Sequence, residues 1–402
     1  MNIAICDGEQ SKPMLVNRDI LCFSHDWTGD PLSKTHLMRL LSRNNRILWV
    51  NSIGYRTPSA NAADLSRAWK KLQAAREPLH EVEPNIFVLN LLAIPAYGLG
   101  IVRRINQIWL GRQIKRAMKR LGFKRPINWV FNPAAAVIAG KLGEELLIYQ
   151  CVDEYSAFSG VKAEAMLNLE EQLLRKSHLV IVSAEPLRVA KSKINPKTVL
   201  VRHGVDYEHF SKALAEETIV PDEIADLPRP IIGFFGLIAD WVDTDLMAEV
   251  ARRYPQGSLV VLGKATTDTT VMNLPNVHLL GRKPYADLPA YGKGFDVALN
   301  PFRINELTHN ANPLKVREYL AAGLPVVSTD IPEVSVLGWC RIGRSRDEFL
   351  QEVDAALKKP GPQAEISELV RGESWQSRLE EIERHLATAT LASSEYDERT
   401  TR

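Results

Sequence analysis

The chain has 402 residues, 24% of them charged, and a formal net charge of +2 at pH 7. This length allows two domains with separate cores, and the balanced charge excludes a disordered chain and indicates no nucleic-acid partner. The four cysteines form no Cys-x-x-Cys pair, so we expect no zinc site and a reducing compartment.

The amino terminus, "MNIAICDGEQSKP", lacks a basic region followed by an apolar stretch. We therefore expect no signal peptide and a cytoplasmic protein. Residues 84–102 are uncharged and approach the length of a membrane span, but the Asn, Pro and Gly among them favour a strand, a loop and a helix start. We predict no transmembrane segment.

Short apolar runs alternate with amphipathic stretches, which predicts an α/β protein with mostly parallel sheets covered on both faces. In the first half the expected strands are residues 20–24, 46–50, 86–92, 127–131, 146–150, 178–183 and 198–202, and the expected helices are 34–43, 101–121, 162–176 and 186–193. In the second half the expected strands are 231–235, 258–262, 277–280, 295–299 and 325–328, with helices at 245–254 and from Pro313.

Residues 206–229 form an acidic segment that interrupts this alternation of strands and helices, and we interpret it as a linker. We therefore predict a tail (1–18), an N-terminal Rossmann-like domain (19–205), the linker (206–229), a C-terminal Rossmann-like domain (230–370), a C-terminal helix (371–388) and a disordered tail (389–402). Two doubly wound domains of this kind face each other, and a ligand is expected at the carboxyl ends of the second sheet, where the cleft opens.

Residues 85–143 contain no Asp or Glu, while ten Lys and Arg accumulate there. Apolar residues such as Ile105, Trp109 and Met118 interleave with them, which predicts a basic amphipathic helix over residues 101–125. Such a face suits an anionic membrane surface, each basic residue contributing about 1 kcal/mol, and would place the protein on the inner face of the plasma membrane. The alternative is a solvated basic face on a core helix.

The stretch "NPLKVREYLAAGLPVVST" predicts a helix followed by a buried strand. Asn312 is a suitable N-cap, Pro313 suits the first helical position, and Gly323 ends the helix. Lys315 and Glu318 then lie a turn apart on one face, beside free N–H groups that attract anions. This combination indicates a phosphate followed by a sugar, whereas the alternative is a surface ion pair worth a few tenths of a kcal/mol.

This stretch, with "FDVALNPF" before it and "VRHGVDYEHF" at the domain junction, resembles the donor-binding half of GT-B fold glycosyltransferases. The likeness is to the family-four type, which includes the teichuronic acid biosynthesis glycosyltransferases. "GFFGLIADWVDTDLM" and "LVVLGK" are similar to that group, and so are "HDWTGDPLSKTHLMRLLSRNNRILWVN" and "LLIYQCVDEYSAFSG" in the first half. The resemblance covers residues 19–386.

The resemblance implies a GT-B fold of two Rossmann-like domains and transfer of a sugar, with retention, from a nucleotide-diphosphate sugar to a glycan or lipid-linked acceptor. It implies no cofactor and no obligatory metal. Glu318 would bind the ribose of the donor, while Lys315 and backbone N–H groups near Asn312 and Gly236 would hold the diphosphate. Arg282 and Lys264 contact the base or phosphate on this view, or are solvated loop charges.

The chain departs from the family pattern at two places. Asn310 stands where family four usually has a Glu, so this side chain can bond a hydroxyl but carries no charge. The loop "GLIADWVDTDL" lacks the usual Arg and Lys for the diphosphate, so Lys315 carries more of that charge, or Arg303 or another basic residue compensates. Within this loop, residues 243–245 ("DTD") are read as a helix cap rather than a metal site.

In the first domain, loops after two strands overhang the expected cleft. His25 and Asp26 are candidates to orient an acceptor hydroxyl, or are structural residues. Asp153, next to Glu154, is a candidate to accept a proton or to stabilise an oxocarbenium-like transition state. We expect His203 to be a hinge residue hydrogen-bonded to backbone.

Two other functions stay open at this point. A non-hydrolysing nucleotide-sugar 2-epimerase has the same fold and a similar donor site, but it requires no acceptor. An inactive nucleotide-binding module is consistent with both departures. A nicotinamide dehydrogenase is disfavoured because no Gly-x-Gly-x-x-Gly follows a strand.

Overall fold

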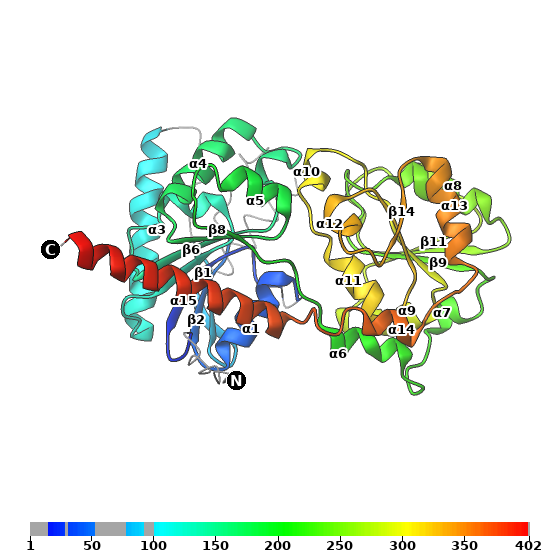
Figure 1. Cartoon of the computed structure of the whole chain (residues 1–402), viewed down its shortest axis with the longest axis horizontal. Coiled ribbons are helices and arrows are strands. Elements are labelled where there is room, and N and C mark those ends of the chain that lie inside the picture. The colour runs from blue at the N-terminus through cyan, green and yellow to red at the C-terminus, as the bar shows by residue number, and fades with distance from the viewer. Residues whose placement is uncertain (1–14, 29–30, 53–77, 92–99, 401–402) are drawn as a thin grey trace, which may run out of the picture.

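The computed structural model describes residues 15–28, 31–52, 78–91 and 100–400, without the side chains of residues 100–104, 106 and 389–400. The chain forms two α/β lobes that lie side by side, each built on its own sheet (Figure 1). The fold class predicted from the sequence is confirmed.

The N-terminal sheet has the strand order β3-β4-β2-β1-β5-β6-β7-β8. These strands are β1 (Asp19–Phe23), β2 (Arg46–Val50), β3 (Leu79–Glu83), β4 (Ile86–Leu89), β5 (Ile127–Val130), β6 (Leu146–Cys151), β7 (Leu179–Val182) and β8 (Thr198–Leu200). The helices around them are α1 (Ser33–Ser42), α3 (Gly100–Leu121), α4 (Ala163–Lys176) and α5 (Glu185–Lys191), with 3-10 turns η1 (Pro133–Val137) and η2 (Tyr155–Ala157). Only the pairing of β3 with β4 is antiparallel among the described strands.

The C-terminal sheet is wholly parallel and has the order β11-β10-β9-β12-β13-β14. Its strands are β9 (Ile231–Phe235), β10 (Ser258–Leu262), β11 (Val277–Gly281), β12 (Val297–Asn300), β13 (Val326–Thr329) and β14 (Arg341–Gly343). Its helices are α8 (Thr244–Arg253), α9 (Leu288–Gly294), α10 (Glu306–His309), α11 (Leu314–Ala321), α12 (Pro332–Ser335), α13 (Arg346–Ala356) and α14 (Ala364–Glu368), with η4 (Thr270–Met272) and η5 (Tyr285–Asp287).

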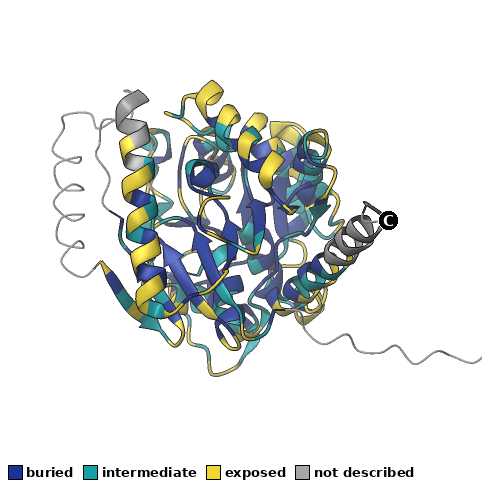
Figure 2. Ribbon diagram, turned by 90° about the vertical axis from the view of Figure 1, so that its left-hand side faces the viewer, coloured by how far each residue is buried: buried dark blue, intermediate teal, exposed yellow. Residues whose placement is uncertain are grey.

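The central strands are continuous apolar runs because both faces of a parallel sheet are covered by helices. All five residues of β9 and of β10 are buried. Figure 2 shows the same arrangement, with dark blue strands inside and yellow residues on the outer sides of the helices. The strands expected from these runs agree with the observed ones to within about three residues at each end. Edge strand β3, "LHEVE", was not predicted, since only its first residue is buried.

The predicted linker is wrong as a separate segment. Residues 206–229 form α6 (Tyr207–Phe210), the 3-10 turn η3 (Ser211–Leu214) and α7 (Asp222–Ala225). Phe210, Ala213 and Ile224 are buried in the core of the C-terminal lobe. This segment is therefore part of the second domain.

The last helix, α15 (Trp375–Thr400), returns to the N-terminal lobe and crosses its face (Figure 1). Trp375, Leu379 and Ile382 are buried in the core of that lobe. The helix is longer than predicted, and the expected disordered tail is wrong for residues 389–400 because helical backbone continues to Thr400, while residues 401–402 lie outside the described residues. At the other terminus, the Leu15 N–H donates to Glu383 at 3.2 Å, so residues 15–18 are attached to the same helix, while residues 1–14 lie outside the described residues. In the described part of the chain, no helix combines the length and the apolar character needed to span a bilayer.

Candidate active site between the two lobes

A cavity of about 690 Å³ opens between the lobes. The N-terminal lobe contributes charged and polar residues after β1, β6 and β8, and the C-terminal lobe contributes the loops after β9 and β10 and the start of α11. These are carboxyl ends of parallel strands, where ligands of doubly wound domains bind. The charged side chains that line the cavity are Lys34, Asp153, Lys264, Arg282, Lys283, Lys315 and Glu318.

Lys315, in the first turn of α11, lies against the loop that follows β9. Its Nζ lies 4.1 Å from the ring centroid of Phe234 and 4.9 Å from that of Phe302. Gly236 in that loop has φ +138°, and a Cβ there would lie 2.6 Å from Lys315 Nζ. Glycine is therefore required for the loop and the ammonium to converge, as expected for a diphosphate site. Burial lowers the pKa of Lys315 to about 7, against the charge of Glu318.

Glu318 lines the same cavity one turn further along α11. Burial raises the pKa of its carboxyl to about 7, while the positive charge of Lys315 acts in the opposite direction. The neighbouring Tyr319 hydroxyl accepts the Phe235 N–H at 2.8 Å and so fixes the end of β9 against α11. The helix therefore positions both predicted side chains and the loop that faces them.

The predicted N-cap is wrong, because α11 begins at Leu314 with Pro313 in the cap position and no side-chain cap. Asn312 is buried and lies between the lobes instead. Its Nδ2 donates to the Ser183 carbonyl at 2.7 Å, and its Oδ1 accepts from Arg317 at 2.7 Å. Since Asn312 also lines the cavity, it links the candidate donor site to the domain contact.

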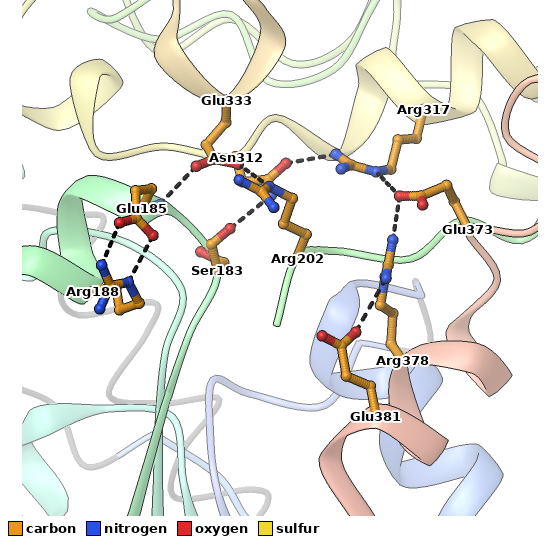
Figure 3. Close-up of polar contacts among 10 residues, drawn as sticks. All are labelled: Ser183, Glu185, Arg188, Arg202, Asn312, Arg317, Glu333, Glu373, Arg378 and Glu381. Atoms are coloured by element: carbon orange, nitrogen blue, oxygen red, sulfur yellow. Dashed lines mark hydrogen bonds and ion pairs between the residues drawn. The ribbon is translucent and has the colours of Figure 1, made fainter. Parts of the chain in front are cut away.

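Figure 3 shows this contact as a polar network that we call the interdomain clasp, from Glu185 and Arg202 on one lobe to Glu333 and Arg317 on the other. The Glu333 carboxylate is 1% exposed; it accepts the Glu185 backbone N–H and Arg202 Nε, both at 2.7 Å. Arg317 continues the network by donating to Glu373 at 3.4 Å, just before α15. The clasp therefore fixes how the two halves of the cavity face each other.

The other predicted donor residues are placed differently. Lys264 and Arg282 line the cavity and are both exposed. Asn310 does not line it; its Nδ2 donates to the Glu306 carbonyl at 2.8 Å at the end of α10. The structure thus brings together Gly236, Lys264, Arg282, Asn312, Lys315 and Glu318, and leaves Asn310 outside.

The first acidic residue of "DTD" caps a helix, as predicted, and the second lies in the first turn of that helix. Asp243 is the N-cap of α8 and accepts the Leu246 N–H at 3.0 Å. Arg303 lies 3.7 Å from Asp243 and 3.1 Å from Asp245, so its guanidinium is engaged by this pair. The described residues contain no cluster of three or more His, Cys, Asp or Glu that could hold a metal ion.

On the N-terminal side, Asp153 and Glu154 have separate environments. Asp153 lines the cavity, and burial raises the pKa of its carboxyl to about 6 although Lys34 opposes the change. Glu154 points into the lobe, where its Oε2 accepts from Lys191 Nζ at 2.7 Å. Lys191 also donates to Glu170 at 2.8 Å. Asp153 is therefore the member of the pair that faces the cavity.

His25 and Asp26 do not line the cavity. His25 Nδ1 lies 3.0 Å from the hydroxyl of Ser24, and Asp26 Oδ1 accepts the Ser52 N–H at 2.9 Å and its hydroxyl at 2.7 Å. The structure thus places both side chains in loop contacts and away from the site.

Two cavity residues were missed or misread from the sequence. Lys34 lines the cavity from the first turn of α1. His203, expected to bond backbone, is 5% exposed and lines the cavity, and its ring makes no hydrogen bond to any described residue. Its ring packs at 5.9 Å from Trp375, a contact that only the return of α15 creates.

Comparison with known proteins identifies the fold and matches part of the second lobe to a family. Residues 229–359 match the family Glycosyl transferases group 1, and they include Gly236, Lys315 and Glu318. The chain has the GT-B fold, and the match to the group 1 family lies within its second lobe. Among solved structures, this GT-B chain is similar to sucrose-phosphate synthase from Thermosynechococcus elongatus, at 15% identity and TM-score 0.62, with 96% of this chain and 100% of the other covered. It is also similar to Anabaena HepE in complex with UDP-glucose, at 13% identity and TM-score 0.62, with 92% and 99% covered.

In sequence, the GT-B chain is 25% identical over 226 residues to the Bacillus subtilis (strain 168) protein named teichuronic acid biosynthesis glycosyltransferase TuaH. The match spans 52% of this chain and 56% of that relative. The match therefore supports the family resemblance, but it covers only part of each protein.

Proposed function

We propose that this GT-B protein transfers a sugar from a nucleotide-diphosphate sugar to a hydroxyl of a glycan or lipid-linked acceptor in the biosynthesis of a cell-surface polysaccharide. The observation that carries this proposal is the convergence of Gly236, Lys315 and Glu318 in one cavity. Two similar proteins support it, since one is named for teichuronic acid biosynthesis and another was solved in complex with UDP-glucose.

In this reaction the bond between the anomeric carbon and the diphosphate breaks, and its electron pair leaves with the diphosphate. Lys315 and the backbone N–H groups around it stabilise that charge in a site closed to water. A bond then forms to the acceptor oxygen, with retention at the anomeric carbon as the family resemblance implies. The Asp153 carboxylate, across the cavity, supplies negative charge for an oxocarbenium-like transition state and a place for the hydroxyl proton.

The donor assignment predicts that Glu318→Ala weakens nucleoside diphosphate binding by about 1.5–3 kcal/mol, the range for a hydrogen bond to a charged group. A thermal-shift screen with UDP, GDP, ADP, CMP and dTDP selects the nucleotide, and calorimetry measures its affinity. Glu306→Ala, which removes an exposed carboxylate from α10, is the matched control and should leave the affinity unchanged. Equal affinity of wild type and Glu318→Ala would reject the ribose assignment. If no nucleotide shifts the wild-type melting temperature, the transferase proposal fails.

We further propose that α3 places the enzyme on anionic lipid at the inner face of the plasma membrane. Ile105, Ile108 and Trp109 are 44%, 50% and 51% exposed, whereas Ile114 and Met118 are buried in the core. The next turns expose only basic charges: Arg112, Lys115, Arg116, Lys119 and Arg120. An apolar patch followed by cations fits an anionic interface.

Changing Arg116, Lys119 and Arg120 together to Glu should abolish most binding to vesicles that contain phosphatidylglycerol. The reason is that each basic residue contributes about 1 kcal/mol of attraction and each Glu adds repulsion. Sedimentation with vesicles measures the bound fraction. A control with the same charge change, at the exposed residues Lys197, Lys358 and Lys359, should bind like wild type. Equal binding of both triple variants would reject α3 as the lipid contact.

A further inference from the structure

The N-terminal half of the cavity carries a cation that the donor site does not use. Lys34 lines the cavity, yet its ammonium makes no hydrogen bond or ion pair with any described residue. The ring centroid of Phe131 lies 5.8 Å from its Nζ. Burial lowers the pKa of Lys34, while Asp153 in the same wall acts in the opposite direction. Among the described residues, Asp153 is the carboxylate that acts on this lysine, and it forms no ion pair with it.

The backbone around Lys34 adds to the positive potential. Helix α1 has 10 residues, its N-cap Leu32 provides no side-chain cap, and its first turn contains no acidic residue. The N–H groups of Ser33 and Lys34 find no acceptor among the described residues, and Pro31, Leu32 and Ser33 all line the cavity. Free N–H groups at a helix start attract anions.

His203 is an independent sign of a ligand at this place. It is 5% exposed, it lines the cavity, and its ring nitrogens make no hydrogen bond within the described part of the chain, so they are open to the cavity. Burial, together with the charges of Arg317, Lys34 and Arg378, lowers its pKa to about 3, so the ring is neutral at pH 7. A neutral imidazole donates one hydrogen bond and accepts another. A polar ring that lines a cavity and makes no hydrogen bond to the described residues is available to a ligand, which on this proposal is the substrate.

We propose that Lys34, His203 and the first turn of α1 form a subsite for an anionic group, a phosphate or a carboxylate, carried by the acceptor. This inference rests on the proposed function, because it takes the diphosphate of the donor to occupy Lys315 on the other lobe. Asp153 lies in the same wall as Lys34, so an acceptor bound there presents a hydroxyl near Asp153 and its charged group to Lys34. The structure thus favours acceptors that bear negative charge close to the attacked hydroxyl.

The test uses calorimetry on the full chain, with and without the nucleoside diphosphate selected by thermal shift. The probes are inorganic phosphate, glucuronate and neutral glucose. Wild type should bind phosphate, glucuronate or both at least about tenfold more tightly than glucose, and Lys34→Met should remove this preference. Lys34→Arg should retain most of it, because the charge is kept. Lys197→Met is the control, since it removes an exposed lysine at the amino end of β8, away from the cavity.

The probes also identify the source of the charge. Preference for phosphate indicates an acceptor with a phosphate monoester or diester, and preference for glucuronate indicates a uronic acid residue; either supports the subsite. Anion binding no tighter than glucose binding in folded wild-type protein would overturn the inference. A loss of nucleotide affinity in Lys34→Met greater than about twofold would assign Lys34 to the donor site and overturn it too. Nucleotide binding by the wild-type protein is measured in a separate titration. If that binding is absent, the proposed function is rejected, and this outcome is distinct from a failure to bind the anionic probes.

Discussion

Replacing Lys191 by Met is expected to lower the free energy of unfolding by about 3–5 kcal/mol, the typical cost of removing one partner from a buried ion pair. Lys191 lies 2.7 Å from Glu154 and 2.8 Å from Glu170, and all three side chains are nearly inaccessible. The variant would leave two carboxylates buried together with no counter-charge. Few single substitutions in this chain should cost more.

Two further bonds make the surroundings of Lys191 rigid. Glu170 also accepts the Tyr149 hydroxyl at 2.7 Å, and Glu154 accepts the Ser156 hydroxyl at 2.6 Å. Burial alone would raise the pKa of Glu154, but Lys191 and Ser156 hold it below 4.5. Because the folded pKa is depressed, this stabilisation is present above pH 4.5 and is lost as the pH falls below it.

Denaturant unfolding at pH 7 measures the loss in Lys191→Met. Lys193→Met, two residues away at an exposed position, should change the free energy of unfolding by less than about 0.5 kcal/mol. Adding Glu154→Gln and Glu170→Gln to Lys191→Met should recover part of the loss, since the uncompensated charges are removed. A loss below about 1 kcal/mol in Lys191→Met would show that water reaches the three groups.

The fold could be predicted largely from the sequence because parallel strands covered on both faces are apolar throughout. The ends of a run such as Ser258–Leu262 therefore mark the ends of the strand. Edge strand β3 is not a continuous apolar run. It is a strand because it pairs with β4, and its own composition does not indicate a strand. Residues 206–229 read as a linker because they are acidic, although a few apolar residues suffice to attach them to the second core.

The candidate site could be predicted where the chemistry is local. Lys315 and Glu318 share a helical face by their spacing alone, and the structure places both in the cavity. Asn312 was misread because its partner, Ser183, lies 129 residues away in the other lobe. The same amide side chain can cap a local helix or form hydrogen bonds to the other lobe. Sequence spacing does not distinguish these two roles.

The N-terminal half of the site depends on tertiary contacts. Adjacent carboxylates at the end of β6 look equivalent in sequence, but the buried Lys191 engages Glu154 and leaves Asp153 to the cavity. His203 acquires its position from Trp375, which arrives with the last helix of the chain. These arrangements follow from packing between distant segments, which periodicity and motifs do not encode.

Replacing Gly236 by Ala should weaken nucleoside diphosphate binding by about 100-fold or more, roughly 2.7 kcal/mol. At φ +138° an L side chain is strained, and the new Cβ would lie 2.6 Å from Lys315 Nζ, too close for both to stay in place. The ammonium must then move away from the loop that, with it, forms the diphosphate site. We therefore expect a loss of affinity that exceeds any loss of stability.

A double-mutant cycle with Lys315→Ala tests this mechanism by calorimetry. If Gly236→Ala acts by displacing Lys315, the two substitutions affect the same interaction, so the double variant should bind scarcely more weakly than either single one. Gly122→Ala is the matched control: Gly122 also has a positive φ, +70°, but no atom lies within 4 Å of an added Cβ. It should cost some stability and leave nucleotide affinity unchanged, because strain without displacement of Lys315 does not reach the diphosphate. Fully additive losses in the cycle would show that Gly236 and Lys315 contact the nucleotide independently.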